Sequence, residues 1–213
     1  DLLPRLLRTG SKHVVYAIRP YPASRVIDCG DVGRFAGLAI EEYLRGFGFS
    51  YPVGSRQAAG VILRARRVVT AGNGGSLAVA QHAAQDWAKI GGIDVCAIND
   101  PSMVTAYGND LGFGESIAGP ISRKNLTDQD CLVIYSGSGD SENVVRAARM
   151  AAVRGCPVVV VTAADGGKAA DFATVCIRAP FTRARMQECE DFFMLWSHGL
   201  ARALQGLVAE GQC

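Results

Sequence analysis

The sequence predicts a three-layer α/β fold, in which a doubly wound parallel sheet is covered by helices on both faces. Five apolar runs of four or five residues are too short for buried helices, and most are rich in β-branched residues. Segments with apolar residues at three- and four-residue spacing separate most of these runs. Such alternation is typical of parallel sheets, because parallel strands need crossover connections.

The predicted elements follow from these two periodicities. Strands are expected at Val68–Ala71, Val95–Ile98, Cys131–Tyr135, Val158–Thr162 and Thr174–Ile177. Helices are expected at Gly75–Ala88, Glu142–Arg154 and Arg185–Leu207, and before the sheet at Val32–Phe47 and about Arg56–Arg66. The two early helices could pack against the sheet or against another subunit. Residues 1–30, with a candidate strand at Val14–Ile18, form an N-terminal extension of unassigned role, and residues 31–213 are expected to be one domain.

Composition excludes several function classes. With 213 residues and 49% hydrophobic content, the chain can bury a full core. A net charge of +2 with interspersed signs gives no electrostatic footprint for nucleic acid or a membrane surface. No apolar run approaches the ~18 residues of a membrane span. The seven cysteines lack metal or redox spacing, which favours free thiols and a reducing, cytoplasmic setting.

The most informative segment is the turn Ser136-Gly137-Ser138-Gly139-Asp140-Ser141. It directly follows an apolar strand run and precedes a helical pattern that begins near Glu142. A helix N-terminus offers unpaired N–H groups and partial positive charge, and the hydroxyls of Ser136, Ser138 and Ser141 add donors. Glycines at 137 and 139 let the backbone approach a ligand closely. The turn therefore predicts a phosphate site.

A second glycine-rich turn, Gly72-Asn73-Gly74-Gly75-Ser76, follows the first predicted strand. A dinucleotide fingerprint fails because Leu77 stands where the third glycine is needed, and a Walker loop fails because Ala169 follows Gly167-Lys168. Taken alone, this turn is equally well explained as a tight strand-to-helix connection. Two such turns at the carboxyl ends of parallel strands are expected to face one crevice, where ligands bind in open α/β sheets.

His82 and Asp86 lie four residues apart on a predicted helix and so share one face. The pair could hold a metal or transfer a proton, but taken alone it is better explained as a surface hydrogen bond. Its place about two turns into the helix that the glycine turn opens favours a site.

In combination, these motifs resemble the sugar isomerase (SIS) fold, and specifically the phosphoheptose isomerase family. The resemblance covers about residues 31–208, with the motifs in the family's order. They are VVTAGNGGS at 68–76, AQHAAQD at 80–86, AINDPSMVTAYGNDLGF at 97–113, SGSGDSENV at 136–144, TAADGGKAAD at 162–171 and RMQE at 185–188.

The resemblance implies an enzyme that converts sedoheptulose 7-phosphate into a heptose 7-phosphate, as a homotetramer with active sites between subunits. By position, Ser136, Ser138 and Ser141 would hold the phosphate. The residues implied to line the sugar are Asn73, Gly74, Gly75, Asn99 and Asp100. His82, Asp86 and Gln187 would lie at the reacting end, where some family members bind zinc, and no nucleotide cofactor is expected.

The chain departs from the family pattern at three positions. Asp86 replaces a glutamate, Ala184 replaces an aspartate that some members carry, and Leu195 stands at the position of the second catalytic histidine. Asp191, four residues after Gln187, and His198, one turn beyond Leu195, are two candidate substitutes.

The last helix also has a structural explanation. His198 is better explained as a partly buried helix residue in an ordinary hydrogen bond, and Met194, Leu195 and Trp196 as core or subunit packing.

Three functions follow from the sequence. The first is an aldose–ketose isomerase of a long-chain sugar phosphate, in which proton transfer through an enediol needs a base and an acid. The second is a non-catalytic SIS protein that binds a sugar phosphate or a protein, since Leu195 and Ala184 together are what a retired site would show. The third, a nucleotide-dependent oxidoreductase, is disfavoured by Leu77.

Overall fold

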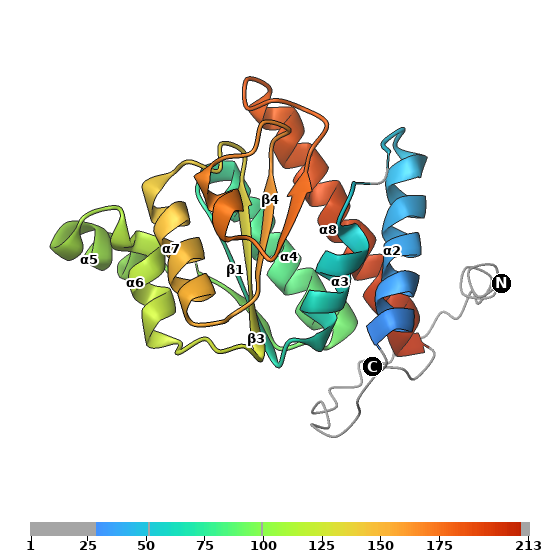
Figure 1. The fold of residues 1–213 in the computed structure, drawn as a ribbon, viewed down its shortest axis with the longest axis horizontal. Helices are drawn as coiled ribbons and strands as arrows, with labels where there is room; N and C mark the ends of the chain where they lie inside the picture. The colour runs from blue at the N-terminus through green and yellow to red at the C-terminus, as the bar shows by residue number, and fades with distance from the viewer. Residues whose placement is uncertain (1–28, 51, 99, 210–213) are drawn as a thin grey trace.

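The computed structural model describes residues 29–50, 52–98 and 100–209, which form a parallel sheet between two layers of helices (Figure 1). Its strands are β1 (Arg67–Gly72), β2 (Val95–Ala97), β3 (Asp130–Ser136), β4 (Val158–Thr162) and β5 (Val175–Arg178). Its helices are α2 (Cys29–Gly46), α3 (Ser55–Arg64), α4 (Gly74–Gly91), α5 (Pro101–Leu111), α6 (Glu115–Arg123), α7 (Glu142–Val153), the short 3₁₀ helix η1 (Lys168–Phe172) and α8 (Met186–Ala209).

The sheet has the order β2-β1-β3-β4-β5, and all its pairs are parallel. From β1 the chain adds β2 on one side and then returns to add β3 on the other, so the order reverses between β1 and β3. Gly72 at the end of β1 pairs with Tyr135 near the end of β3. The turns that follow these strands therefore start side by side at the topological switch point, where open α/β sheets bind ligands. The predicted doubly wound sheet is confirmed.

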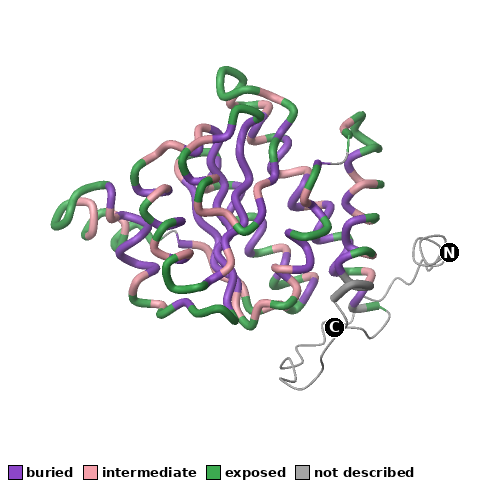
Figure 2. Tube along the Cα trace, in the orientation of Figure 1, coloured by how far each residue is buried: buried purple, intermediate pink, exposed green. Residues whose placement is uncertain are grey.

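Alternate residues of each strand serve two separate cores, as the two-residue period of a strand requires. Val68 and Val133 face one core, with side chains from α2, α3, α4 and α8. Val69 and Ile134 face the other, with side chains from α6 and α7. The central strands are buried along almost their whole length (Figure 2), because a parallel sheet is covered on both faces.

The two helices expected before the sheet pack on this same chain. α2 and α3 contact each other, and α2 also packs along α8 (Figure 1). The indole N–H of Trp196 donates to the Ser55 hydroxyl of α3 at 3.1 Å. Trp196 is fully buried, and Met194 and Leu195 pack partly buried against the same core, which confirms that this stretch of α8 serves packing. The possible strand at 14–18 lies outside the described residues.

Helices α5 and α6 were not expected. None of the α5 residues is buried, so no apolar stripe marks the helix in the sequence. α6 carries Pro120 in its interior, a residue that normally argues against a helix. No described helix is long and apolar enough to cross a membrane.

Candidate functional site

The serine turn connects β3, which ends at Ser136, to α7, whose N-cap residue is Ser141. The Ser136 hydroxyl oxygen accepts from the N–H of Gly139 at 3.1 Å, and the Ser138 hydroxyl oxygen accepts from the N–H of Asp140 at 3.2 Å. Ser141 makes no capping hydrogen bond through its side chain. Since each of these oxygens acts as an acceptor or makes no bond to the helix, all three O–H groups can donate to an anion.

Two glycines of this turn occupy positions that favour glycine. Gly139 has a φ of 64°, in the left-handed region that favours glycine. A side chain at Gly137 would collide with the thioether of Met186. The backbone of the turn is thus closely covered by the first residue of α8.

The beginning of α8 lies across both glycine-rich turns. Met186 meets Gly137 of the serine turn, and Glu190 meets Gly75 of the turn after β1, where any side chain would overlap its carboxylate. Four residues separate Met186 from Glu190, or about 6 Å along the helix. This confirms that the two turns lie together on one side of the sheet.

A pair of hydrogen-bonded amides joins the turn after β1 to the first turn of α7. Asn73 and Asn143 each donate from Nδ2 to the other's Oδ1 at 2.9 Å. Asn143 is fully buried, donates also to the Ser116 hydroxyl at 2.9 Å and accepts from the N–H of Val144 at 3.0 Å. Asn73, expected to line the sugar, therefore has a fixed side chain whose amide is already engaged.

Arg183 links the serine turn to the loop that follows β4. It donates to Asp140 and to Asp165, both at 2.7 Å, and to the carbonyl oxygen of Gly166 at 3.1 Å. The pKa of Asp140 is lowered by the hydrogen bond from the Lys168 N–H and by that from Arg183. The pKa of Asp165 is lowered chiefly by the hydrogen bond from Arg183. Both carboxylates thus stay ionised and partly neutralised beside the predicted phosphate site.

The remaining residues expected to contact the sugar are placed as follows. Gly74 and Gly75 are exposed at the start of α4, in agreement with a position in an open crevice. Asp100 is the N-cap of α5 and accepts from the N–H and hydroxyl of Ser102, which lowers its pKa. Its carboxylate is therefore already used in capping a helix. Asn99 lies outside the described residues.

His82, Asp86 and His198 form a cluster between α4 and α8. The two Nε2 atoms of the histidines lie 3.1 Å apart, and the Asp86 Oδ2 lies 3.3 Å from His82 Nε2 and 3.8 Å from His198 Nε2. Burial lowers the pKa of His198, and the nearby His82 lowers it further, while Asp86 acts in the opposite direction. His198 is thus a hydrogen-bonded residue of α8, and it also lies beside His82 and Asp86, the pair that the sequence singled out.

The cluster fits a zinc ion by donor type and by spacing. Two imidazole nitrogens and one carboxylate oxygen are ligands that zinc favours, and ligands about 2.0 Å from a tetrahedral ion lie about 3.3 Å from one another. All three ligand atoms lie within 4.8 Å of one another. A fourth ligand position would be left for water or substrate.

Gln187 and Asp191 are exposed on the first turns of α8. Gln187 precedes His198 by eleven residues, or about 16 Å along the helix axis. Within one chain, the structure brings His198 to His82 and Asp86 but does not bring Gln187 to them.

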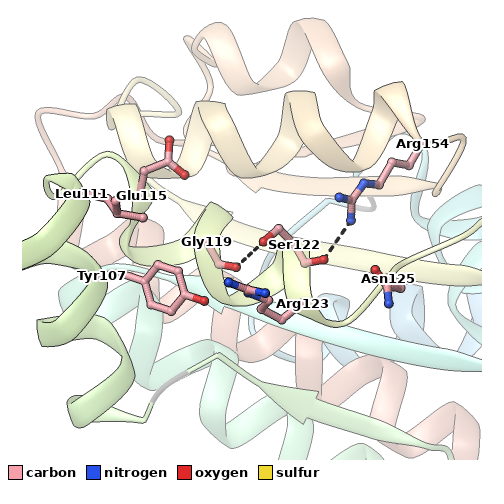
Figure 3. A pocket seen from close by; sticks show the side chains of 8 residues that line it. All are labelled: Tyr107, Leu111, Glu115, Gly119, Ser122, Arg123, Asn125 and Arg154. Atoms are coloured by element: carbon pink, nitrogen blue, oxygen red, sulfur yellow. Dashed lines mark hydrogen bonds between the residues drawn. The ribbon is translucent and has the colours of Figure 1, made fainter.

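A cavity of about 470 Å³ lies away from both turns and from the histidine cluster, between α5, α6 and the end of α7 (Figure 3). Arg154 donates there to the carbonyl oxygen of Ser122 at 3.2 Å, and the Ser122 hydroxyl donates to the carbonyl oxygen of Gly119. The cavity contains none of the predicted site residues. We therefore locate the site by its chemistry, at the two turns, rather than by the volume of this hollow.

Three residues near the two turns were not among the candidates, because no sequence pattern marks them individually. Asn143 follows the serine turn within a helical pattern, Arg183 lies in an irregular loop, and Glu190 is one of three acidic residues early in α8. Each acquires its place through a long-range contact, with Asn73, Asp140 and Gly75 respectively.

Comparison with known proteins places these features in context. A sequence model of the SIS domain family matches residues 54–163, which include both glycine-rich turns. The phosphoheptose isomerase of Rhodospirillum rubrum is 37% identical over 169 residues, covering 74% of this chain and 85% of that protein. The phosphoheptose isomerase of Aneurinibacillus thermoaerophilus is 33% identical, covering 62% and 70%.

Two solved structures share the architecture. A phosphoheptose isomerase from Neisseria gonorrhoeae superposes with a TM-score of 0.64 at 28% identity, covering 82% of this chain and 92% of that one. A phosphoheptose isomerase from Francisella tularensis gives a TM-score of 0.65 at 22% identity, covering 83% and 92%, and this likeness concerns the fold.

Proposed function

Because the chain belongs to the phosphoheptose isomerase family of SIS domain proteins, we propose that it interconverts a ketose and an aldose of a phosphorylated seven-carbon sugar such as sedoheptulose 7-phosphate. The observation that carries the proposal is the serine turn, which offers three hydroxyl donors and a helix N-terminus beside a second glycine turn. This arrangement suits a ligand with a phosphate at one end and a polyol chain that extends from it.

The phosphate would bind at Ser136, Ser138 and Ser141, with the N-terminus of α7 directed at it. Its charge would be tolerated beside Asp140 because Arg183 neutralises that carboxylate. The sugar chain would extend over Gly74, beside which the space is open, toward Gly75, where the Glu190 carboxylate lies.

Isomerisation moves one proton between two neighbouring carbons and another between their oxygens, through an enediol. It needs a base beside the carbon and an acid beside the carbonyl oxygen. The candidates from the sequence are His82, Asp86, Gln187, Asp191 and His198. Of these, His82, Asp86 and His198 lie together.

We infer that the His82, Asp86 and His198 cluster is the place for a divalent metal, with His198 acting where the sequence pattern suggested Gln187. When bound, zinc would supply Lewis-acid stabilisation of negative charge on an oxygen. The chain's own contribution is to hold the three ligand atoms close together, because α4, which carries His82 and Asp86, packs against α8, which carries His198.

We further propose that the protein works as a homotetramer in the cytoplasm, without a nucleotide cofactor, and that residues 31–213 act as one SIS domain. The relation to phosphoheptose isomerases supports the assembly, and the unpaired described cysteines, of which Cys131 and Cys156 are buried, suit a reducing compartment. Mass measurement of the purified full chain in solution tests the tetramer.

The test of the function is incubation with sedoheptulose 7-phosphate, with and without added zinc, followed by detection of the aldose phosphate. Turnover is expected, and sedoheptulose without its phosphate should react far more slowly because the serine turn is then unused. Binding of the phosphorylated ketose without turnover would instead support a non-catalytic sugar-phosphate binder. Neither binding nor turnover with seven- or eight-carbon ketose phosphates would reject the proposal.

A further inference from the structure

Glu190 places a carboxylate directly at the glycine turn after β1. Its Oε1 lies 3.4 Å from the hydroxyl of Ser76, and its carboxylate fills the space that a side chain at Gly75 would need. The residue is half-buried, so its carboxylate is held by contact yet remains reachable from the crevice.

Among the described residues, Glu190 takes part in no ion pair, unlike its neighbour Glu188, which accepts from Arg185 at 2.9 Å. Its single side-chain hydrogen bond, with Ser76, is long. A carboxylate that is held in place but left without a cation keeps lone pairs available for a proton.

Distances along α8 show which carboxylate a bound sugar can reach. An extended seven-carbon chain spans about 7.5 Å from C1 to C7, at about 1.5 Å per carbon–carbon bond with tetrahedral angles. Glu190 lies about 6 Å along α8 from Met186, which covers the serine turn. His198 lies twelve residues from Met186, or about 18 Å along the axis. Within one chain, a sugar anchored by its phosphate reaches Glu190, whereas the cluster of His82, Asp86 and His198 lies further along α8 and would meet the sugar from another subunit of the proposed tetramer.

We propose that Glu190 is the catalytic residue that carries the proton between C1 and C2, an inference that rests on the isomerase function proposed above. In the direction from ketose to aldose, the carboxylate takes a proton from C1. The C1–H electrons form the C1=C2 double bond, the π electrons of C2=O move to O2, and O2 takes a proton from solvent water to complete the enediol. O1 then returns a proton to solvent water, C1=O forms, and the C1=C2 electrons take the proton from Glu190 at C2. No electrons are gained or lost overall.

The test uses the full chain with Glu190→Gln, Glu190→Asp and, as a matched control, Glu188→Gln. Glu190→Gln keeps the size and the contact with Ser76 but removes the base, so kcat should fall by about 100-fold or more while KM changes little. Glu190→Asp should retain part of the activity. Glu188→Gln should behave as the unsubstituted chain, because Glu188 pairs with Arg185 away from Gly75.

A second readout separates proton transfer from a structural role. In D₂O, the unsubstituted chain should place deuterium on the carbons that exchange a proton, and Glu190→Gln should lose this exchange while its melting temperature and its affinity for the sugar phosphate stay unchanged. Unchanged kcat in Glu190→Gln, or continued deuterium exchange, would overturn the role of Glu190 while leaving the isomerase function intact. Absence of turnover by the unsubstituted chain would overturn both.

Discussion

The hydroxyls of Tyr135 and Ser197 lie 2.8 Å apart in the buried core, where the end of β3 meets the middle of α8. Ser197 donates its own proton to the carbonyl oxygen of Phe193 at 2.8 Å, so Tyr135 is the donor to Ser197. The carbonyl oxygen of Ser197 in turn accepts from the indole N–H of Trp87 on α4 at 3.1 Å. One residue of α8 is therefore fixed to both a central strand and α4, directly beside His198.

Tyr135→Phe should destabilise the protein by about 1–2 kcal/mol, because the Ser197 oxygen loses a buried donor while the ring stays in place. Urea unfolding followed by circular dichroism measures this loss. Tyr107→Phe is the matched control, since the Tyr107 hydroxyl makes no hydrogen bond with the described residues, and its effect should stay within about 0.5 kcal/mol. Equal effects of the two substitutions would contradict the role given to Tyr135.

Ser141→Ala should weaken the binding of a sugar phosphate by about tenfold or more without a loss of folding stability. A hydrogen bond to a charged group contributes about 1.5–3 kcal/mol, whereas the Ser141 side chain makes no cap bond to α7 that folding would miss. Calorimetric titration of the ligand and thermal unfolding measure the two quantities. Ser122→Ala, in the hollow between α5 and α7, is the control and should leave the affinity unchanged.

Arg183→Ala should weaken sugar-phosphate binding by about tenfold at low salt, because Asp140 and Asp165 would then face the phosphate without a compensating cation. The difference from the unsubstituted chain should shrink as salt is added, since the groups are exposed and screening is effective. Arg154→Ala serves as the control for loss of a positive charge elsewhere on the surface. An affinity loss independent of salt would argue against this electrostatic explanation.

Asp130 gives a prediction about acid stability. Burial alone would raise its pKa, but hydrogen bonds from Thr127 and the charges of Arg67 and Arg66 outweigh burial, so the pKa is lowered from 3.8. A lowered pKa in the folded state means that the stabilisation is present above the unfolded pKa of about 3.9 and is lost as the pH falls through the folded value.

Asp130→Asn should therefore destabilise the protein at pH 7, by about 3 kcal/mol, and by a smaller amount near pH 2. Urea unfolding at the two pH values measures the difference. A deficit that is as large at pH 2 as at pH 7 would show that the charge of Asp130 is not the cause.

His198→Ala should weaken cobalt or zinc binding by at least tenfold, because one of three ligand atoms is removed. Gln187→Ala should leave the affinity unchanged, as Gln187 lies about 16 Å along α8 from His198. Cobalt absorption and competition with a chromophoric chelator measure the binding without reference to turnover. The opposite ranking of the two variants would restore Gln187 as the ligand expected from the sequence.

Much of the fold could be predicted because it depends on local patterns. The run Val158–Thr162 forms β4 with the predicted bounds, and β3 extends its prediction by one residue at each end. α7 begins at Glu142, where the serine turn was expected to lead into a helix. These elements combine strong periodicity with clear breaks, so their sequence determines them.

The site could be predicted only in part. The serine and glycine turns are contiguous motifs and were recognisable, whereas the meeting of His198 with His82 depends on how α8 packs along α4. Leu195, which stands where the family resemblance places a histidine, packs partly against the core instead. Glu190 and Asn143 likewise depend on contacts between segments far apart in the chain, which periodicity does not encode.

The contacts of α8 with Gly137, Gly75 and His82 are made by a single uninterrupted helix. Insertion or deletion of one residue between Glu190 and Ser197 would turn everything beyond it by about 100°. His198 would then face away from His82 even though no ligand residue had been altered. In this part of the chain, the number of residues determines the geometry of the cluster as much as their identity does.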